Sequence, residues 1–326
     1  MTVKERPSTR AGAPGPVDPA PAPTPPNRVR RRAFTIRRGL VILAFMLPAA
    51  LFVAVFTYYP MLAGSQMAFR NWKLSDLTDT SWVGFQNFVT IFTDPSFGVI
   101  LGNSVVWVVA SIVPQLVIGF AIALWLRRKF RFRGVYQALI FFPWAISGFL
   151  IGILFRWMFN GEFGVVNDLL MKAGLIDQGI PWLAQPGTAM FAVIVANVWY
   201  GVTFFAIMIL AALQSVPDEL FEAAAIDGAG KVRTLFQITI PYISTTLALT
   251  VLLRIIWIFN FPDIIWAMTG GGPANQTHII TTWMITFTQK GDYGVASALG
   301  LIVVGLLLVF SAFYLMALRG KKEVRS

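Results

Sequence analysis

Six long apolar segments constrain the fold of this chain more than any other feature of its sequence. A helix that crosses the hydrocarbon core of a membrane needs about 20 predominantly apolar residues. Segments of that kind lie at residues 39–62, 101–126, 134–158, 189–213, 242–267 and 295–318. Charged residues make up only 13% of the chain, whereas a typical soluble domain has about 25%. The sequence therefore predicts an all-α membrane protein with six transmembrane helices.

Lysine and arginine are distributed unevenly between the two sides that these segments define. The two termini and the loops after the second and fourth segments hold 20 of the 26, and the opposite side holds 5, including Arg156 at the end of the third segment. Basic residues accumulate on the cytoplasmic side of membrane proteins. We therefore expect both termini and those two loops in the cytoplasm. The same rule accounts for the net charge of +11 without a nucleic-acid partner.

The two ends of the chain are typical of tails outside a membrane domain. Residues 1–27 are rich in proline, alanine, glycine and threonine, a composition that cannot bury a core and predicts disorder. Residues 28–38 are rich in arginine, and the apolar segment that follows is too long for a signal peptide. The expected organisation is a cytoplasmic tail at 1–38, a membrane domain at 39–318 and a short basic cytoplasmic tail at 319–326.

The loop between the fourth and fifth segments, residues 214–241, is unusually small-residue-rich and acidic. Pro217, followed by two acidic residues, is typical of a helix start, and Gly228 and Gly230 are typical of a helix end. A helix of about ten residues is marginal in water, so it needs a surface to pack against. We expect a partner protein to supply that surface, with apolar contacts to Leu220 and Phe221 and charged contacts to Glu222 and Asp227. A second apolar helix is expected over 231–240, ending at Pro241.

The spacing within this loop resembles a known family. Glu222-Ala223-Ala224, Asp227-Gly228-Ala229 and then Phe236, Ile240 and Pro241 resemble the EAA loop of ABC importer permeases. In that family the loop is a coupling helix seated in a cleft of the ATPase subunit. The resemblance implies a type I permease architecture, and it implies that the ATPase is contacted by Glu222, Ala223, Ala224, Asp227, Gly228 and Ala229.

Further motifs resemble the carbohydrate-uptake branch of that family, whose best-known member is the maltose permease. They are Arg254, Asp263, Thr269-Gly270-Gly271-Gly272-Pro273 and the stretch Asn197-Val198-Trp199-Tyr200-Gly201 with Phe204. The similarity covers residues 40–318. This sequence departs from the branch at Pro262, where phenylalanine is usual. It also lacks the maltose subunit's external insertion, extra N-terminal spans and asparagine-rich stretch, so maltose itself is not implied.

The resemblance implies that sugar is contacted by Asn197, Trp199, Tyr200, Phe204, Asn260 and Asp263. Aromatic faces stack on sugar C–H surfaces, and amides or carboxylates bond hydroxyl groups. The alternative is that the tryptophans fill helix contacts and the asparagine bonds a neighbouring helix. The residues alone favour that alternative; the resemblance favours a substrate role for Asn197 and Trp199 and leaves Asn260 open.

Arg254 lies inside the fifth apolar segment. An arginine at the centre of a membrane helix costs about 2.5–3.5 kcal/mol on insertion scales, so its side chain should face protein or water. Asp263 lies nine residues later, about 13 Å along a regular helix, and cannot pair with it there. We expect a structural or gating role for Arg254.

The sequence offers no residues for catalysis or for a cofactor on this chain. There is no cysteine, and the single His278 cannot form a multi-histidine metal site. Gly228-Ala229-Gly230-Lys231 lacks the first glycine of a phosphate-binding loop and has Val232 where serine or threonine is needed. The chain is therefore predicted not to be an enzyme, and ATP and Mg²⁺ are expected on partner ATPase subunits.

The resemblance and the residues together predict the permease subunit of an ATP-driven importer for a sugar or oligosaccharide in a bacterial cell membrane. The implied partners are a second permease subunit, two ATP-binding subunits and an external sugar-binding protein. Three alternatives stay open: the same machine carrying glycerol phosphate or a polyol, a secondary transporter, and a non-transporting scaffold. A secondary transporter would need intramembrane carboxylates, and the six segments contain only Asp263.

Overall fold

The computed structural model describes residues 28–323, with side chains described for residues 41–318. The chain divides into two units, one up to Pro60 and one from Met61 onward. The first unit holds α1 (Arg28–Val53) and a π-helical turn, η1 (Ala54–Tyr58), which continues into α2 (Tyr59–Met67). The basic stretch 28–38, predicted as part of a tail, is helical. The disorder predicted for 1–27 lies outside the described residues.

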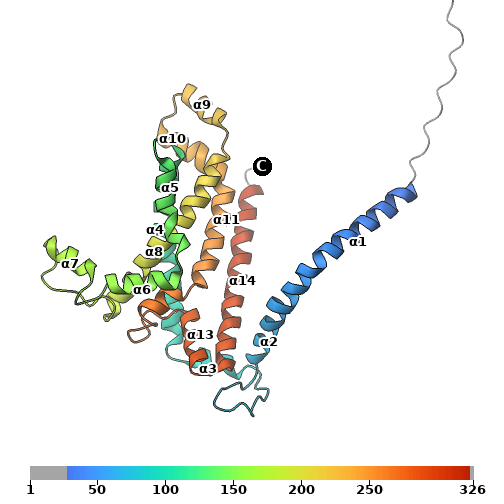
Figure 1. The fold of residues 1–326 in the computed structure, drawn as a ribbon, viewed down its shortest axis with the longest axis vertical. Coiled ribbons are helices and arrows are strands. Elements are labelled where there is room, and N and C mark those ends of the chain that lie inside the picture. The colour runs from blue at the N-terminus through green and yellow to red at the C-terminus, as the bar shows by residue number, and fades with distance from the viewer. Residues whose placement is uncertain (1–27, 324–326) are drawn as a thin grey trace, which may run out of the picture. The chain divides into compact units, whose positions relative to one another are not determined.

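The second unit is a bundle of helices with short helices at its two ends and on one side (Figure 1). Among residues 28–323 there is no β-strand, and only isolated β-bridges occur. In chain order, the unit contains α3 (Gln86–Thr93), α4 (Phe97–Arg127), α5 (Arg133–Phe141), η2 (Phe142–Ala145), α6 (Gly148–Met158), α7 (Val165–Lys172), α8 (Pro186–Gln214), α9 (Asp218–Ile226), α10 (Lys231–Thr234), η3 (Leu235–Thr239), α11 (Ile240–Phe259), α12 (Asp263–Met268), α13 (Ile280–Gln289) and α14 (Tyr293–Glu323).

Within the described residues, five helical stretches are long and apolar enough to cross a membrane. A bent pair of helices gives a sixth if the pair is counted as one span. The five are Val41–Met67, Phe97–Arg127, Pro186–Gln214, Lys231–Met268 and Tyr293–Leu318. This bent pair is the third segment of the chain. The prediction of one continuous helix over 134–158 is wrong, because α5 and α6 meet at an angle of 96°. Pro143 lies in the intervening 3₁₀ turn, and Ile146 and Ser147 are extended. Proline cannot continue the helical hydrogen-bond pattern.

The fifth predicted segment also differs from one straight helix. The α-helix ends at Phe259, and Asn260 to Pro262 separate it from α12. At its other end, the predicted stop at Pro241 is wrong, because α10, η3 and α11 run on without a break. Pro241 lies in the first turn of α11, directly after the π-helical turn η3. Such turns locally change the hydrogen-bond register, so the helix can pass through a proline.

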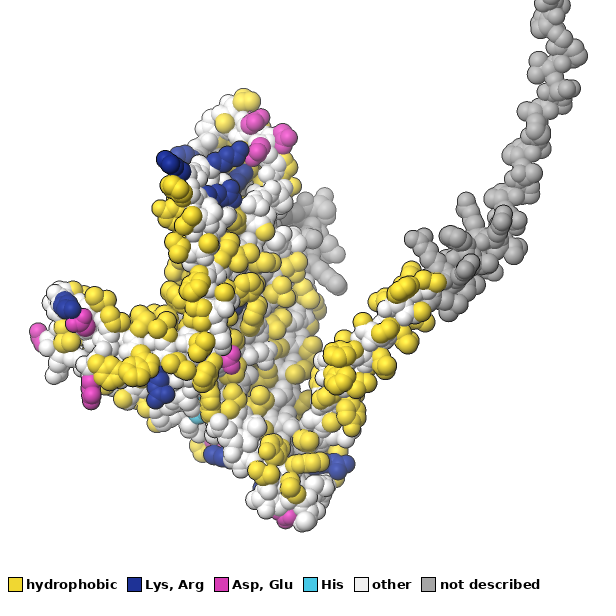
Figure 2. Space-filling model, viewed as in Figure 1, with side chains coloured by type: hydrophobic (Ala, Val, Ile, Leu, Met, Phe, Trp, Pro, Cys, Tyr) yellow, Lys and Arg dark blue, Asp and Glu magenta, His cyan; other side chains and the backbone are white. Residues whose placement is uncertain are grey.

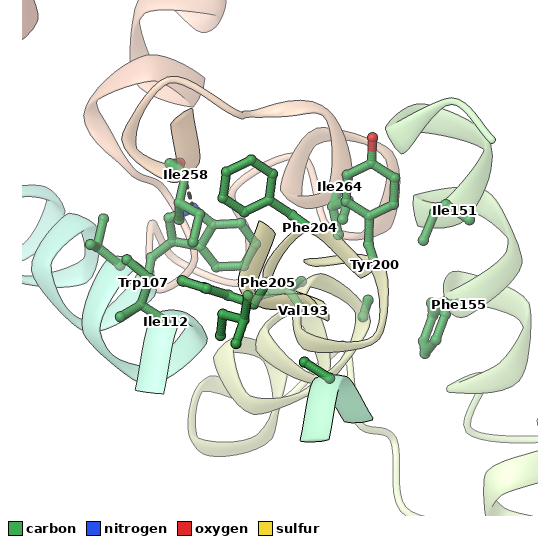
Figure 3. Close-up of a cluster of buried hydrophobic side chains, with 14 of the residues drawn as sticks. Trp107, Ile112, Ile151, Phe155, Val193, Tyr200, Phe204, Phe205, Ile258 and Ile264 are labelled. Carbon is green, nitrogen blue, oxygen red and sulfur yellow. Dashed lines mark hydrogen bonds between the residues drawn. The ribbon is translucent and has the colours of Figure 1, made fainter. Parts of the chain in front are cut away.

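The centre of the second unit is α8, packed along α4. In an apolar stretch of 18 residues within α8, 67% of the residues are buried, whereas in the corresponding stretch of α14 only 6% are buried. Trp107, Phe205 and Ile258 converge in the core from α4, α8 and α11 (Figure 3). The indole Nε1 of Trp107 donates to the Ile258 carbonyl at 3.1 Å. Because such an interior is close-packed, it also holds the buried polar side chains between α4, α8 and α11 in fixed positions.

Two glycines allow α6 to lie close against the segment that follows α11. A side chain at Gly148 would collide with the ring of Phe261, and one at Gly152 would collide with Ala267. The sequence places these glycines four residues apart, on one face of the helix. That small-residue spacing permits close helix packing, as in other membrane helices.

Candidate functional site

The short helix α9 lies at one end of the bundle, and α3 and α13 lie at the other (Figure 1). The start and end of α9 agree with the positions that Pro217 and Gly228 predict. Pro217 precedes the first helical residue, and Asp218 and Glu219 occupy the first turn. Gly228 ends the helix with φ +70°, a conformation that glycine adopts without strain. The predicted short helix therefore exists as a local structure.

The helix is held on its own chain by Arg127, the last residue of α4. The guanidinium lies 3.7 Å from the Asp218 carboxylate and 3.9 Å from the centre of the Phe221 ring. Phe221 is half-buried and Ala224 is buried. We expected Phe221 to be open to a partner, but it is turned toward α4. An arginine over an aromatic ring adds an attraction that an exposed ion pair alone would not supply.

The rest of α9 is exposed and carries an apolar residue, Ile226, that no pattern in the sequence distinguishes. Ile226 is 86% exposed, and Leu220 is also exposed. Glu222, Ala223, Asp227 and Gly228 are exposed, and Ala229 is half-buried. Beyond the helix, Val232 and Phe236 continue the exposed apolar surface. We call Leu220, Glu222, Ile226 and Asp227 the outer face of α9. Exposed apolar side chains rimmed by polar ones are typical of a surface that binds another protein.

A chain of buried polar side chains crosses the middle of the bundle. Asn197 on α8 donates from Nδ2 to the Ser111 hydroxyl on α4 at 2.9 Å. Gln115 donates from Nε2 to the backbone carbonyl of Asn197 at 2.8 Å and accepts from Arg254 Nε at 2.8 Å. All four side chains are buried. We call Ser111, Gln115, Asn197 and Arg254 the polar cluster; it joins α4, α8 and α11.

Arg254 faces protein, as its insertion cost requires. Its guanidinium lies near the Phe204 and Trp257 rings, with centroid distances of 5.5 and 5.8 Å. Gly201 makes room for it, because a side chain there would collide with both Arg254 and Gln115. Among the described atoms, Arg254 Nη2 and Asn197 Oδ1 have no hydrogen-bond partner. Leaving a buried donor or acceptor without a partner costs stability. These two atoms can therefore still donate or accept a hydrogen bond from another group.

A group of three aromatic rings, of which two are half-exposed, borders the polar cluster. Trp144, in the 3₁₀ turn after α5, lies 6.0 Å from Trp257 and 6.3 Å from Phe204, measured between ring centres. Phe204 and Trp257 are 5.9 Å apart. Trp144 and Trp257 are each 39% exposed. We call Trp144, Phe204 and Trp257 the aromatic cluster. Sequence reasoning missed Trp144, although the Phe-Pro-Trp sequence at a helix break could have drawn attention to it.

The structure separates the residues predicted to contact sugar. Asn197 is buried and bonded to Ser111, which favours the alternative of a helix–helix contact. Tyr200 is buried and stacks on Phe261 at 5.4 Å. Trp199 is exposed and packs toward Phe155 on α6. Phe204 alone of this α8 set belongs to the aromatic cluster.

The two predicted residues near the end of α11 are more open. Asn260 is exposed, and its Nδ2 donates to the Ile256 carbonyl at 3.1 Å. Asp263 is half-buried in the first turn of α12. Neither forms an ion pair in the part of the chain whose side chains are described. The same part contains no group of acidic, histidine or cysteine residues that could hold a metal ion.

The glycine-rich loop after α12 encloses the single histidine. Gly271 has φ +92°, and a side chain there would collide with the His278 ring. His278 Nδ1 lies 3.0 Å from the Thr282 hydroxyl. Burial lowers the pKa of His278 from its ordinary value, and the positive charge of Lys290 lowers it further. The imidazole is therefore a neutral structural group of this loop at pH 7.

Comparison with known proteins identifies relatives across most of the chain. Residues 115–322 match the family model described as "Binding-protein-dependent transport system inner membrane component". The chain is 32% identical to the sulfoquinovosyl glycerol transport system permease protein SmoG of Agrobacterium fabrum, over 86% of this chain and 91% of the relative. It is 31% identical to the diacetylchitobiose uptake system permease protein DasB of Streptomyces coelicolor, over 90% of this chain and 91% of the relative.

A solved structure is similar over nearly the whole fold. It is the crystal structure of a bacterial alginate ABC transporter in complex with an alginate pentasaccharide-bound periplasmic protein. The TM-score is 0.74 at 26% sequence identity, and the match covers 86% of this chain and 94% of that chain.

Proposed function

This chain belongs to the family of binding-protein-dependent transport system inner membrane components, and on that premise we propose that it is the subunit through which an ABC importer moves a sugar or oligosaccharide into the cell. It is a multi-pass membrane protein without an enzyme's chemistry of its own. We propose that ATP and Mg²⁺ are bound by two partner ATPase subunits. A second permease subunit and an external sugar-binding protein complete the assembly, and α9 and both termini lie in the cytoplasm.

The outer face of α9 is the observation that carries this proposal. A helix of nine residues carries exposed acidic and apolar side chains and is tied to α4 by Arg127. A surface of this composition supports docking into a partner's cleft. The tie to α4 means that a partner that moves α9 also displaces the end of a membrane-spanning helix. The predicted ATPase contacts Glu222, Ala223, Ala224, Asp227, Gly228 and Ala229 belong to this element or to its end.

Movement of α9 has a physical route into the membrane. Arg127 and Gln115 are both on α4, about 18 Å apart along the helix. Gln115 in turn accepts a hydrogen bond from Arg254 on α11. We propose that ATP-driven closure of the ATPase pair shifts α4 against α8 and α11 and so opens the pathway to the outside. Each state would be favoured by different contacts, which is the requirement for alternating access.

The aromatic cluster supports a carbohydrate substrate. Trp144 and Trp257 present half-exposed rings beside each other, and such rings suit the C–H faces of a sugar. Both named relatives are transport or uptake permeases for sugar-containing compounds. We therefore add Trp144 and Trp257 to the proposed substrate contacts and retain Trp199, Phe204, Asn260 and Asp263. For Asn197 and Tyr200, burial favours support of the site over direct contact.

The glycerol phosphate alternative needs a basic group in the pathway. Arg254 is the intramembrane residue that a phosphate would use. Its Nη2 has no partner and its Nε is bonded to Gln115, but the side chain is buried. The burial of Arg254 therefore favours an uncharged sugar over a phosphate compound as the substrate that this subunit contacts.

Isolation of the chain from its native membrane in mild detergent tests the proposal. Mass spectrometry should identify a second permease and an ATPase in the same preparation. After reconstitution with the binding protein, a panel of labelled oligosaccharides should enter vesicles only when ATP is supplied. If the chain purified alone and transported a substrate without ATP, the secondary-transporter alternative would replace this proposal.

A further inference from the structure

A hollow of ≈ 860 Å³ lies between the end of α4 and the helices α9 and α10. It is lined by Leu124, Arg127, Arg128, Asp218, Phe221, Ala225, Ala229, Lys231, Val232, Thr234, Leu235 and Thr239. We call it the basic hollow, because three lining residues are cations and one is an acid. The proposed sugar pathway does not include it, and of the six predicted ATPase contacts only Ala229 lines it.

The cations of the basic hollow differ in how far they are already paired. Arg127 lies 3.7 Å from Asp218 and covers the Phe221 ring. Arg128 and Lys231 form no ion pair within residues 41–318. Arg128 is at the end of α4 and Lys231 at the start of α10, so the hollow places two available positive charges on different elements. An anion between them would be attracted by both.

The remaining lining is suited to an amphiphile. Leu124, Phe221, Val232 and Leu235 line the same hollow, and Val232 is exposed. Figure 2 shows basic side chains gathered just below α9, whose own charged side chains are acidic. Basic pockets between membrane helices on the cytoplasmic side are sites for phosphate-bearing lipid headgroups.

We propose that the basic hollow binds the phosphate group of an anionic phospholipid from the cytoplasmic leaflet, held by Arg128 and Lys231. The glycerol and upper acyl chain contact Leu124, Val232 and Leu235. This assignment rests on the proposed cytoplasmic position of α9 and goes beyond the transport function. A bound lipid bridges α4 and α10, which line the hollow together with α9, so membrane composition affects how firmly α9 is held.

Native mass spectrometry of the full chain in detergent, titrated with phosphatidylglycerol or phosphatidylcholine, tests this site. The variant Arg128→Gln/Lys231→Gln should bind phosphatidylglycerol roughly thirty-fold more weakly, since each basic residue near an anionic lipid contributes a factor of about five. Lys129→Gln/Arg131→Gln is the matched control, because it removes the same charge from the loop after α4 at residues that do not line the hollow. It should bind within about twofold of the unchanged chain. Arg128→Lys/Lys231→Arg should retain binding.

The outcomes separate the possible explanations. Equal losses in the two glutamine variants, or no loss in either, would overturn the proposal in favour of general attraction to a basic surface. Equal binding of phosphatidylcholine would overturn the requirement for an anionic lipid. Displacement of phosphatidylglycerol by millimolar inorganic phosphate would assign the hollow to a soluble phosphate compound and overturn the lipid as its source. Thermal unfolding of each variant shows that it is folded. Loss of lipid binding with ATP-driven uptake retained would leave the proposed function standing.

Discussion

Arg254 Nε on α11 donates a 2.8 Å hydrogen bond to Gln115 Oε1 on α4, and both side chains are buried. The pair lies directly on the backbone of α8 at Gly201. Three membrane-spanning helices therefore meet at one polar contact. A hydrogen bond to a charged group contributes about 1.5–3 kcal/mol to stability, so small changes here should have measurable effects.

Gly201→Ala should destabilise the chain. The added methyl group would collide with Arg254 and Gln115, and overpacking a tight interior typically costs about 1–3 kcal/mol. The measurement is unfolding of the purified chain in detergent by heat or denaturant.

Gly187→Ala is the matched control for that substitution. Gly187 is also in α8, but a side chain there meets nothing within 4 Å. Its unfolding should be nearly unchanged. Similar losses of stability in both variants would contradict the packing explanation.

Ile226→Ala should weaken association with the ATPase without affecting the isolated chain. Ile226 is 86% exposed, and such surface changes alter stability by less than about 0.5 kcal/mol. A buried interface anchor costs more than about 1 kcal/mol when truncated, so the affinity should fall several-fold. Pull-down titration of the complex measures this effect. An unchanged affinity would show that Ile226 lies outside the interface.

Glu222→Lys should abolish ATP-driven uptake while the protein remains inserted and folded. The substitution reverses an exposed charge on the outer face of α9, and mismatched charges at an interface cost several kcal/mol. Uptake into vesicles is the assay. Glu162→Lys, an exposed charge reversal in the loop between α6 and α7, is the control and should transport normally. Wild-type uptake by Glu222→Lys would exclude it from coupling.

Trp144→Ala should raise the sugar concentration needed for half-maximal uptake. A sugar contact comparable to an aromatic pair contributes about 0.5–1.5 kcal/mol, so removing one ring should change the concentration about 2- to 12-fold. Trp157→Ala is the control, since Trp157 is an exposed tryptophan on α6 that pairs with Phe163. If both variants had the same effect on uptake, the aromatic cluster would not be specific for sugar.

The stability of the chain should fall as the pH is lowered through about 6.5. Burial lowers the pKa of folded His278 below its ordinary value, so the unfolded chain binds the proton more readily. The contribution of His278 is therefore complete above about pH 6.5 and decreases as the pH falls toward the folded pKa. Melting temperatures of the chain and of His278→Gln between pH 5 and 8 measure this difference. A slope unchanged by His278→Gln would assign the effect to other groups.

Local signals in the sequence predicted much of the fold. Apolar segments located the spans, because the cost of exposing polar backbone to lipid allows few alternatives. Pro217 and Gly228 located α9, because their backbone preferences act within a few residues. The cost of a lipid-facing arginine placed Arg254 against protein. Each of these predictions depended on a residue and its immediate neighbours.

The sequence did not predict features that depend on how the helices bend and pack. The bend of 96° between α5 and α6, the passage of a helix through Pro241 and the exposure of Ile226 appear only in the folded chain. The same holds for the partners of Asn197 and for the position of Trp144 beside Trp257. The sequence by itself determined which segments are helical and apolar, since those properties are local. The tertiary structure alone decided which side chains meet, because helix packing in the bundle determines which face of each helix is buried.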